Sequence, residues 1–297
     1  MSTVLITTPL EISTARDYWQ LLKPRVMFLV VFTGIVGLLI APGYIHPVIA
    51  LAAILCIAVG SGAAGAINMW YERDMDALME RTKGRPLPQG KLQPGEALGF
   101  GLTLAIGSVV VMYLLVNFWA AFYLAVAILF YVLVYTFWLK RITPQNIVIG
   151  GAAGALPPVI GWVSVMHETS LLPWILFGII FLWTPPHFWA LALYRHEDYA
   201  KAKVPMLPVV AGLEKTKNQI LFYILALIPL TFFPVYLGDF GFFYGSIAFI
   251  LGLLFFIFGV KVRLSTEPKD GLRLFFYSIV YLFLLFAAMV GDRIGNL

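Results

Sequence analysis

"VIALAAILCIAVGSGAAGAINMWYERDMDALMERTKGRPLP", residues 48 to 88, joins an apolar run to a dense cluster of charge. The first part, 48–67, is long enough to cross a hydrocarbon core of about 30 Å as a helix, which needs roughly 20 apolar residues. The second part, 68–88, holds four carboxylates and four cationic side chains. We therefore expect a membrane helix that carries a polar site at its end.

The composition of the whole chain supports an integral membrane protein. Of its 297 residues, 61% are hydrophobic and 12% are charged, whereas soluble domains carry about 25% charged residues. The single cysteine, Cys56, lies within an apolar run, which excludes a disulfide framework and a cysteine metal site. Residues 1–23 lack the pattern of a signal peptide and are interpreted as a short cytoplasmic tail.

Nine apolar stretches are long enough to span a bilayer as helices. They are expected near 24–42, 48–67, 96–116, 119–138, 146–165, 172–193, 219–237, 242–261 and 273–291. The pattern predicts an all-α, polytopic fold with a single membrane domain over 24–291.

The connections between these stretches predict the orientation of the chain. If the nine stretches span the membrane, 19 of the 20 Lys and Arg residues fall on one side and only Arg293 falls on the other. Positive charge collects on the cytoplasmic side, so we expect a cytoplasmic N-terminus, cytoplasmic loops over 68–94 and 194–218, and an external C-terminus at 292–297. The sequence shows no soluble basic domain that would make nucleic acid a partner.

The first charged segment predicts a metal site. Asn68, Glu72 and Asp76 are spaced by four residues, which places them on one face of a helix, whereas Asp74 points elsewhere if the helix continues. Carboxylates at this spacing repel each other, and Mg²⁺ favours a few carboxylates together with phosphate oxygens. The following cations, Arg81, Lys83 and Arg85, suit a phosphate group. An ordinary solvated loop is the alternative interpretation.

A second segment, "HFWALALYRHEDYAKAKVPMLP" at 187–208, repeats the pattern more weakly. Glu197 and Asp198 precede Lys201 and Lys203, and both segments end in prolines, which favour a loop. Along a continuous helix His187, Leu191, Tyr194 and Asp198 would form one stripe, so Asp198 is expected to face the same way as His187. Two such clusters on one membrane face predict a diphosphate chelated by Mg²⁺ between two helix ends.

These residues resemble the UbiA superfamily of intramembrane prenyltransferases. Its first aspartate-rich motif also has an Asn, acidic residues at +4 and +8, and a basic loop. The resemblance rests on "LKPRVMFLVVFTGIVG" at 22–37, "DMDALMERTKGRPLP" at 74–88, "YTFWLKRITPQNIVIGGAAGALPPVIGW" at 135–162, and "FLWTPPHFWALALYRHEDYAKAKVPMLPVV" at 181–210. The chain departs from the family where Glu72 replaces the usual Asp, and where the second motif keeps only Glu197 and Asp198.

The resemblance implies a fold and a reaction. The expected fold is a bundle of nine transmembrane helices around a central cavity that opens to the cytoplasmic face. The blocks are most similar to members that join the farnesyl group of farnesyl diphosphate to a vinyl group of haem b, with addition of water, to give haem O and diphosphate. The resemblance also implies Mg²⁺ or Mn²⁺ as cofactor, surrounding membrane lipid of the bacterial cytoplasmic (inner) membrane, and a haem A synthase-type partner enzyme.

Residue roles follow from the motifs and the resemblance together. The residues expected to carry the reaction are Asn68, Glu72, Asp76 and Asp198. The expected metal ligands are Glu72, Asp76, Glu197 and Asp198. The expected diphosphate contacts are Arg81, Lys83, Arg85, Lys140, Arg141, Lys201 and Lys203. The expected acceptor pocket comprises Arg25, Tyr135, Trp183, His187 and Tyr194.

Several of these assignments have structural alternatives. Arg25, Lys140 and Arg141 could equally be anchors at the membrane surface. Aromatic residues can stabilise a farnesyl cation by cation–π contact, and the candidates are Tyr131, Tyr135, Trp138, Trp183 and Trp189, but aromatic residues also anchor helices at the interface.

His187 follows two prolines that are expected to distort their helix at membrane depth, and it is a candidate ligand of haem iron. A histidine bonded to a neighbouring helix is the alternative. The small residues Gly150, Gly151 and Gly154 are expected to allow close helix packing.

Two rival functions share parts of this pattern. A prenyltransferase that acts on a quinone precursor or another aromatic acceptor would use the same diphosphate site. A membrane transporter with broken helices would need ionisable residues deep within its spans, whereas the charges here lie mainly at helix ends on one side. The pattern therefore favours an enzyme that opens toward the cytoplasm.

Overall fold

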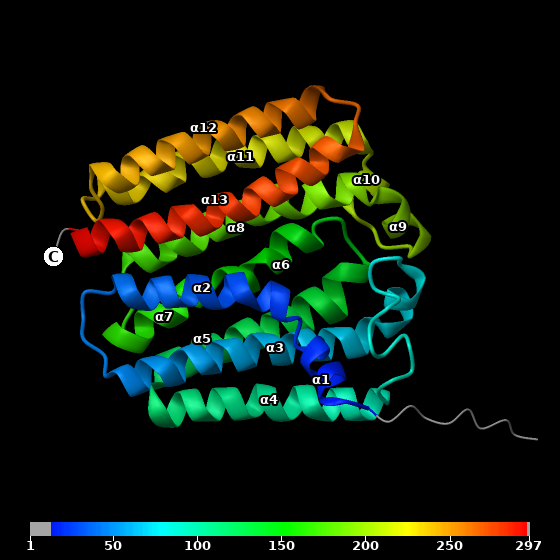
Figure 1. The fold of residues 1–297 in the computed structure, drawn as a ribbon, viewed down its shortest axis with the longest axis horizontal. Coiled ribbons are helices and arrows are strands. Elements are labelled where there is room, and N and C mark those ends of the chain that lie inside the picture. Colours follow the sequence, from blue (N-terminus) through cyan, green and yellow to red (C-terminus); the bar gives the residue numbers. More distant parts are fainter. Residues whose placement is uncertain (1–12, 296–297) are drawn as a thin grey trace, which may run out of the picture.

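The computed structural model describes residues 13–295, and this part of the chain is helical with no strand. The long helices lie side by side in one bundle (Figure 1). The elements are α1 Ala15–Leu21, α2 Pro24–Ile40, α3 Pro47–Leu78, α4 Pro94–Leu115, α5 Phe118–Leu129, the π-helix η1 Phe130–Trp138, the 3₁₀ turn η2 Leu139–Arg141, α6 Asn146–Ala155, α7 Pro157–Met166, α8 Leu171–Tyr194, α9 His196–Lys201, α10 Leu207–Val210, α11 Leu213–Tyr236, α12 Phe242–Leu264 and α13 Pro268–Gly295. Parts of the predicted tail and external C-terminus, 1–12 and 296–297, lie outside the described residues.

The number of membrane-spanning segments agrees with the prediction of nine. Within residues 13–295, eight segments are long and apolar enough to cross a membrane, and the bent pair α1–α2, with an angle of 55°, makes a ninth. Two of the eight are composite, because α5 with η1 and η2 forms 118–141 and α6 with α7 forms 146–166. Large apolar side chains such as Phe28, Phe222 and Leu264 are exposed on the outside, as expected for a multi-pass membrane protein.

Several boundaries differ from those predicted. Helix α3 continues to Leu78, so residues 68–78 of the predicted loop 68–94 are helical, and the charged motif is built on a rigid element. The predicted loop 194–218 contains α9, α10 and the first turns of α11. The predicted tail 1–23 contains α1. A charged helix end outside the hydrocarbon core does not have to unwind, because its backbone hydrogen bonds are satisfied within the helix.

The two prolines before His187, which were expected to distort their helix, do not interrupt it. Helix α8 runs unbroken through Pro185 and Pro186. Each proline removes one backbone N–H, so the carbonyls of Phe181 and Leu182 lose their usual donor four residues later, a loss that helices within a membrane bundle tolerate. The side chains that follow the prolines therefore keep a helical arrangement.

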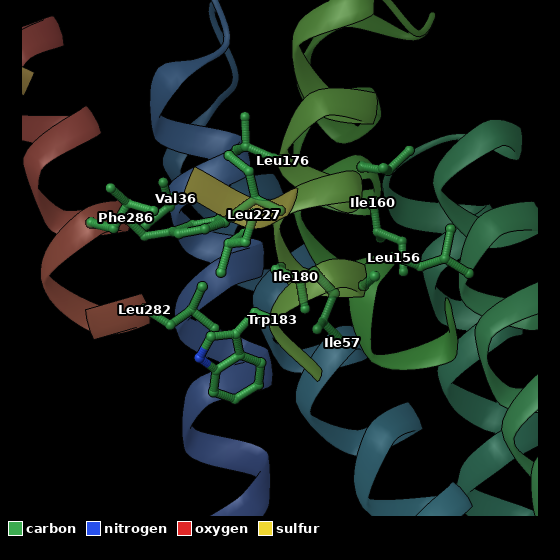
Figure 2. Close-up of a cluster of buried hydrophobic side chains, with 14 of the residues drawn as sticks. Val36, Ile57, Leu156, Ile160, Leu176, Ile180, Trp183, Leu227, Leu282 and Phe286 are labelled. Atoms are coloured by element: carbon green, nitrogen blue, oxygen red, sulfur yellow. The ribbon is translucent and has the colours of Figure 1, made fainter. Parts of the chain in front are cut away.

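The core lies where α2, α7, α8 and α13 approach one another. Figure 2 shows Val36, Ile160, Leu176 and Phe286 among its buried side chains. Helices α2 and α7 are especially close, since a Cβ built on Gly161 would lie 2.0 Å from the Gly34 carbonyl oxygen. Small residues permit such backbone contact between membrane helices. This packing supports the ends of the helices that carry the charged motifs.

Both charged motifs lie at the same end of the bundle. The loop after α3 and the short helices α9 and α10 are neighbours at the right of Figure 1, whereas the C-terminal end of helix α13 lies at the opposite end. Glu80, after α3, interacts electrostatically with Lys201 at the end of α9. The motifs lie far apart in the sequence, at 68–88 and 187–208, so the fold brings them together.

Candidate functional site

The predicted polar face of α3 is confirmed in the structure. Asn68, Glu72 and Asp76 are all buried, with 1%, 2% and 4% of their surface exposed. The Asn68 side-chain amide donates to Glu72 Oε1 at 2.6 Å, so the two side chains share one face. Two buried carboxylates on one helix face would be costly unless cations compensate them.

Three cations from different parts of the chain surround this face. Lys140, in η2, forms an ion pair with Glu72, and Arg85, in the loop after α3, forms one with Asp76 at 2.5 Å. Lys23, between α1 and α2, donates to Asn68 Oδ1 and interacts electrostatically with both carboxylates. We call these six residues the charged site: Lys23, Asn68, Glu72, Asp76, Arg85 and Lys140.

Asn68 connects the charged site to the π-helix η1. Besides Glu72, its amide nitrogen reaches Thr136 Oγ1 at 3.0 Å, and Thr136 is fully buried. Thr136 lies within the nine-residue π-helix η1, a rare conformation in proteins. Asn68 therefore links the Glu72 carboxylate to η1 and to Lys23, and its part in the reaction stays a prediction.

The loop after α3 folds back over the end of its own helix. The Thr82 hydroxyl donates to the Asp76 carbonyl at 2.9 Å, and Thr82 is fully buried. A backbone hydrogen bond from Arg85 to Thr82 continues the turn. This turn explains how Arg85 meets a carboxylate nine residues earlier, and it agrees with the prediction that the motif leads into a loop over the site.

Lys23 has an unusual backbone conformation. Its φ is 53° and its ψ is 57°, in the left-handed region, and Pro24 follows directly. Non-glycine residues in this region carry strain of about 1–3 kcal/mol, and such residues cluster at functional sites. The conformation turns the chain from α1 into α2 at the point where the Lys23 ammonium contacts Asn68.

The charged site fits a divalent cation and a diphosphate by its chemistry. Two buried carboxylates, Glu72 and Asp76, offer hard oxygen donors, and the surrounding cations match phosphate oxygens. No group of three or more His, Cys, Asp or Glu side chains within residues 13–295 is placed to hold a metal by itself. The fit is therefore to a metal that shares its coordination with diphosphate and water.

Arg141 pairs with Asp74 and not with the two buried carboxylates, although it interacts electrostatically with Glu72. Its role toward diphosphate stays a prediction. Its guanidinium binds the Asp74 carboxylate at 2.7 and 3.0 Å and lies 4.8 Å from the Tyr71 ring centroid. Asp74 points away from Glu72, as the helical spacing predicts, and its side chain is 60% exposed. These residues belong to a separate surface pocket of about 340 Å³ that is also lined by Trp70 and Arg73.

The other cations of the first loop are peripheral. Arg81 is exposed, and Lys83 forms an exposed ion pair with Glu80 at 2.6 Å. The hydrogen bond from Lys83 lowers the pKa of the Glu80 carboxyl group. Arg81 nevertheless interacts electrostatically with Tyr135, so it lies within reach of groups that line the site. Its role toward diphosphate stays a prediction.

The second motif approaches the first but is less enclosed. Asp198 is paired with Arg195 at 3.3 Å, whereas Glu197, Lys201 and Lys203 are exposed. Helix α8 ends at Tyr194 and α9 begins at His196, so the continuous stripe from His187 to Asp198 that we predicted is wrong. Metal ligation by Glu197 and Asp198 stays a prediction. Lys203 has a φ of 53°, the same left-handed conformation as Lys23.

Tyr135 lies beside the charged site. Its ring centroid is 5.6 Å from the Lys140 ammonium and 5.2 Å from the ring of Tyr131. It also interacts electrostatically with Tyr199 of α9. Gly150 of α6 makes room for this ring, because a Cβ there would lie 2.3 Å from Tyr135 Cδ2. The prediction that these glycines allow close packing is confirmed at Gly150.

The other candidate acceptor residues are dispersed. Trp183 and His187 are stacked on each other at the interface of α8 with α13. Arg25 is exposed near the start of α2, and the Tyr194 ring lies 5.4 Å from the Arg195 guanidinium. Of the further aromatic candidates, Trp138 is 60% exposed, and Trp189 is buried against Tyr223. A single pocket formed by all five predicted residues is not apparent from their contacts.

Sequence reasoning missed Lys23, Thr136 and Thr82. Lys23 lies in the block "LKPRV" at 22–26, where a lysine at the start of a membrane helix is typical of a surface anchor. Thr136 and Thr82 have short side chains that carry no motif. Both threonines are fully buried, with 0% exposure, and both form hydrogen bonds with the α3 motif. Only these two observations identify them as part of the site.

Comparisons with known proteins identify the family of this chain. Residues 30–285 match the UbiA prenyltransferase family. A relative from Azorhizobium caulinodans, named protoheme IX farnesyltransferase, is 57% identical over 287 residues, which cover 95% of this chain and 94% of the relative.

Two solved structures share the fold at lower sequence identity. A digeranylgeranylglyceryl phosphate synthase superposes with a TM-score of 0.79 at 21% identity, covering 94% of this chain and 98% of the other. A UbiA homologue from Archaeoglobus fulgidus, bound to GPP and Mg²⁺, has a TM-score of 0.65 at 18% identity, covering 92% and 99%. The predicted UbiA-type helical fold is thereby confirmed.

Proposed function

The chain belongs to the UbiA prenyltransferase family, and from this premise we propose that it transfers the farnesyl group of farnesyl diphosphate to a vinyl group of haem b. Water is added in the reaction, and the products are haem O and diphosphate. The observation that carries the proposal is the charged site, in which Lys23, Arg85 and Lys140 surround two buried carboxylates of α3. The identity of 57% to a protoheme IX farnesyltransferase supports haem as acceptor.

The reaction needs charge stabilisation on the leaving group. When the allylic C–O bond breaks, its electron pair stays on the diphosphate and positive charge develops on the farnesyl group. Lys23, Arg85 and Lys140 come from three different elements, and their charges can offset the added negative charge on diphosphate. Preorganised cations of this kind are among the largest contributions to enzymatic rates.

The acceptor completes the bond changes. The π electrons of the vinyl group form the new carbon–carbon bond, which leaves a positive charge on the carbon attached to the porphyrin ring. A water molecule adds its oxygen there and releases a proton, so that a hydroxyl group results. Tyr131 and Tyr135 lie beside the charged site, where their rings can stabilise the farnesyl cation and exclude other water.

We assign the metal to the same site. Glu72 and Asp76 would hold Mg²⁺, or Mn²⁺ in its place, and Asp198 and Glu197 of α9 would contribute from the second motif. When bound, this ion supplies Lewis-acid charge to the diphosphate oxygens. The structure of the Archaeoglobus fulgidus homologue with GPP and Mg²⁺ supports a divalent cation in this fold.

The site is proposed to open toward the bacterial cytoplasm. With a cytoplasmic N-terminus and an external C-terminus, both charged motifs face the compartment that holds farnesyl diphosphate and free Mg²⁺. Reporter proteins fused to each terminus test this orientation, because a reporter active only outside the cytoplasm would be active at the C-terminus alone. We also propose that the product passes to a haem A synthase-type enzyme.

A direct assay tests the proposed function. Purified protein in nanodiscs is incubated with Mg²⁺, farnesyl diphosphate and either haem b or 4-hydroxybenzoate, and products are identified by mass. We expect haem b to gain one farnesyl group and one water. Farnesylation of 4-hydroxybenzoate alone would instead show a prenyltransferase that acts on quinone precursors.

A further inference from the structure

His187 is held in α8 between two aromatic rings. The Trp183 ring lies 4.3 Å from the His187 ring with an interplanar angle of 19°, and Phe275 of α13 lies 4.5 Å away at 25°. Phe188 meets the imidazole edge-on at 5.0 Å. Both faces of the imidazole are therefore covered, and only 7% of the residue remains exposed.

The hydrogen bonds around His187 determine its tautomer. The Ser278 hydroxyl donates its single hydrogen to the Phe275 carbonyl at 2.6 Å. Ser278 Oγ also lies 2.7 Å from His187 Nδ1. With its hydrogen on the Phe275 carbonyl this oxygen accepts from the imidazole, and we assign the ring proton to Nδ1 on this pattern. Ser278 is itself held in place, because Trp183 Nε1 donates to its carbonyl at 2.8 Å.

The remaining nitrogen, Nε2, has a free lone pair. No hydrogen bond to Nε2 from a protein group occurs within residues 13–295. Nε2 is nevertheless not among the fully buried atoms that lack a hydrogen-bond partner, so this atom keeps access to the space beside the ring. An imidazole with one N–H anchored and the other nitrogen directed outward is the usual arrangement of a metal-binding histidine.

The surroundings restrict the kind of metal. No group of three or more His, Cys, Asp or Glu side chains that could chelate a free ion includes His187 within the described chain. A single imidazole instead suits a metal whose other ligands come from a macrocycle. His187 is seven residues before the end of α8 at Tyr194, which places it about 10 Å within the helix, at a depth suited to an apolar ring.

From this geometry we propose that His187 Nε2 is the axial ligand of the iron in the haem acceptor, and that Ser278 is a positioning residue that holds the imidazole in the required tautomer. The inference rests on the proposed function, since it assumes a haem acceptor. The proposal adds a residue of α8, held in place by a residue of α13, that binds the iron of the porphyrin. The protein would then recognise the metal as well as the shape of the ring.

The test compares haem b with metal-free protoporphyrin IX in nanodiscs that contain the full chain. Wild-type protein is expected to bind haem b more tightly than the metal-free ring and to give the absorption spectrum of histidine-ligated iron. His187→Ala should lose that spectrum, and added imidazole should restore it. Ser278→Ala should weaken haem b binding by about 10- to 100-fold, the usual effect of losing a partner of a ligating histidine.

Binding of metal-free protoporphyrin IX should be unchanged in Ser278→Ala, which separates a ligand-positioning effect from general damage to the pocket. The matched control is His196→Ala, because His196 lies at the start of α9 and its ring contacts the Leu193 carbonyl. This variant should keep the wild-type haem spectrum. If His196→Ala lost the haem spectrum and His187→Ala kept it, His196 would be the ligand and the proposal for His187 would be wrong.

The outcomes distinguish the inference from the proposed function. If His187→Ala retains the wild-type spectrum and both porphyrins bind wild-type protein equally, iron ligation is wrong. Formation of haem O, followed by product mass, would then still support the proposed function. If neither porphyrin binds and only 4-hydroxybenzoate is farnesylated, the proposed function fails and the inference fails with it.

Discussion

Lys140 forms an ion pair with Glu72 from a position 68 residues later in the chain, and thereby joins the end of η2 to the polar face of α3. Their side chains are only 19% and 3% exposed. A buried carboxylate left without its cation would be strongly destabilising. The pair therefore balances the charge of the buried carboxylate, and binding of a metal diphosphate would place new charges between these two side chains.

Substitutions at Glu72 test whether its charge or its length matters. Glu72→Asp keeps the charge on the same helix face and should retain partial activity. Glu72→Gln keeps the length but removes the charge that faces Lys140 and the metal, and the loss of a ligand or of its oriented partner typically costs about 10- to 100-fold. The measurement is the initial rate of haem O formation against Mg²⁺ concentration.

Asp74→Asn is the control for this series. Asp74 is exposed and binds Arg141 on the other side of α3, so its loss should be milder than that of Asp76, which is buried beside Arg85. If Glu72→Gln stayed near wild type while Asp74→Asn was inactive, the metal face would have been assigned to the wrong carboxylates.

Arg85 is predicted to bind diphosphate more than haem. Arg85→Ala removes a charge-assisted contact worth about 1.5–3 kcal/mol, so affinity for farnesyl diphosphate should fall about tenfold or more. Arg85→Lys should show a smaller loss because it keeps the charge. Affinities for farnesyl diphosphate and for haem b are measured separately by titration.

Lys83→Ala provides the comparison from the same loop, since Lys83 is exposed and pairs with exposed Glu80. Although the sequence predicts a diphosphate contact for Lys83 as well, this exposed position leads us to expect a smaller loss of diphosphate affinity than in Arg85→Ala. Equal diphosphate affinity in wild type and Arg85→Ala would remove Arg85 from the proposed site. A parallel loss of haem and diphosphate binding would point to disruption of the Asp76 ion pair and of the fold around it.

Removal of divalent cations tests the metal. Treatment with EDTA should abolish haem O formation, and added Mg²⁺ or Mn²⁺ should restore it, because Glu72 and Asp76 would then again share an ion with diphosphate. Turnover is followed by product mass before and after the metal is returned. Full activity in protein that has been stripped of metal would rule out this role for the carboxylates.

The sequence predicted the periodic features of the site. The four-residue spacing of Asn68, Glu72 and Asp76 placed them on one face of α3, and the hydrogen bond between Asn68 and Glu72 confirms it. The spans were equally predictable, because long apolar runs have few alternatives to a membrane helix. These features depend on local spacing and hydropathy, which a sequence displays directly.

The partners of those residues were not predictable from local patterns. Lys23 reaches Asn68 across 45 residues, and His187 meets Ser278 across 91. Nothing in the spacing of a serine on an apolar helix indicates which helix it will contact. Arg141 shows the same limit, because it follows Lys140 directly yet turns to Asp74 on the opposite side of α3, as adjacent residues on a helical turn point in different directions.

Two glycines of α6 test whether the position of Tyr135 matters for the reaction. Gly150→Ala would place a Cβ 2.3 Å from Tyr135 Cδ2, whereas Gly154→Ala meets no heavy atom within 4 Å. Overpacking of this kind costs about 1–3 kcal/mol, and here it would push the tyrosine ring relative to Lys140. We expect Gly150→Ala to lower both thermal stability and the rate of haem O formation.

Gly154→Ala should leave both quantities near wild type, since it adds the same methyl group to the same helix without a clash. A third variant, Gly150→Ala with Tyr135→Leu, removes the aromatic ring that the new methyl group would meet. If the clash with Tyr135 is the cause, this double variant should recover thermal stability but not activity, because the ring beside the charged site is then missing. Recovery of activity as well would show that Tyr135 fills space and does not act on the farnesyl cation.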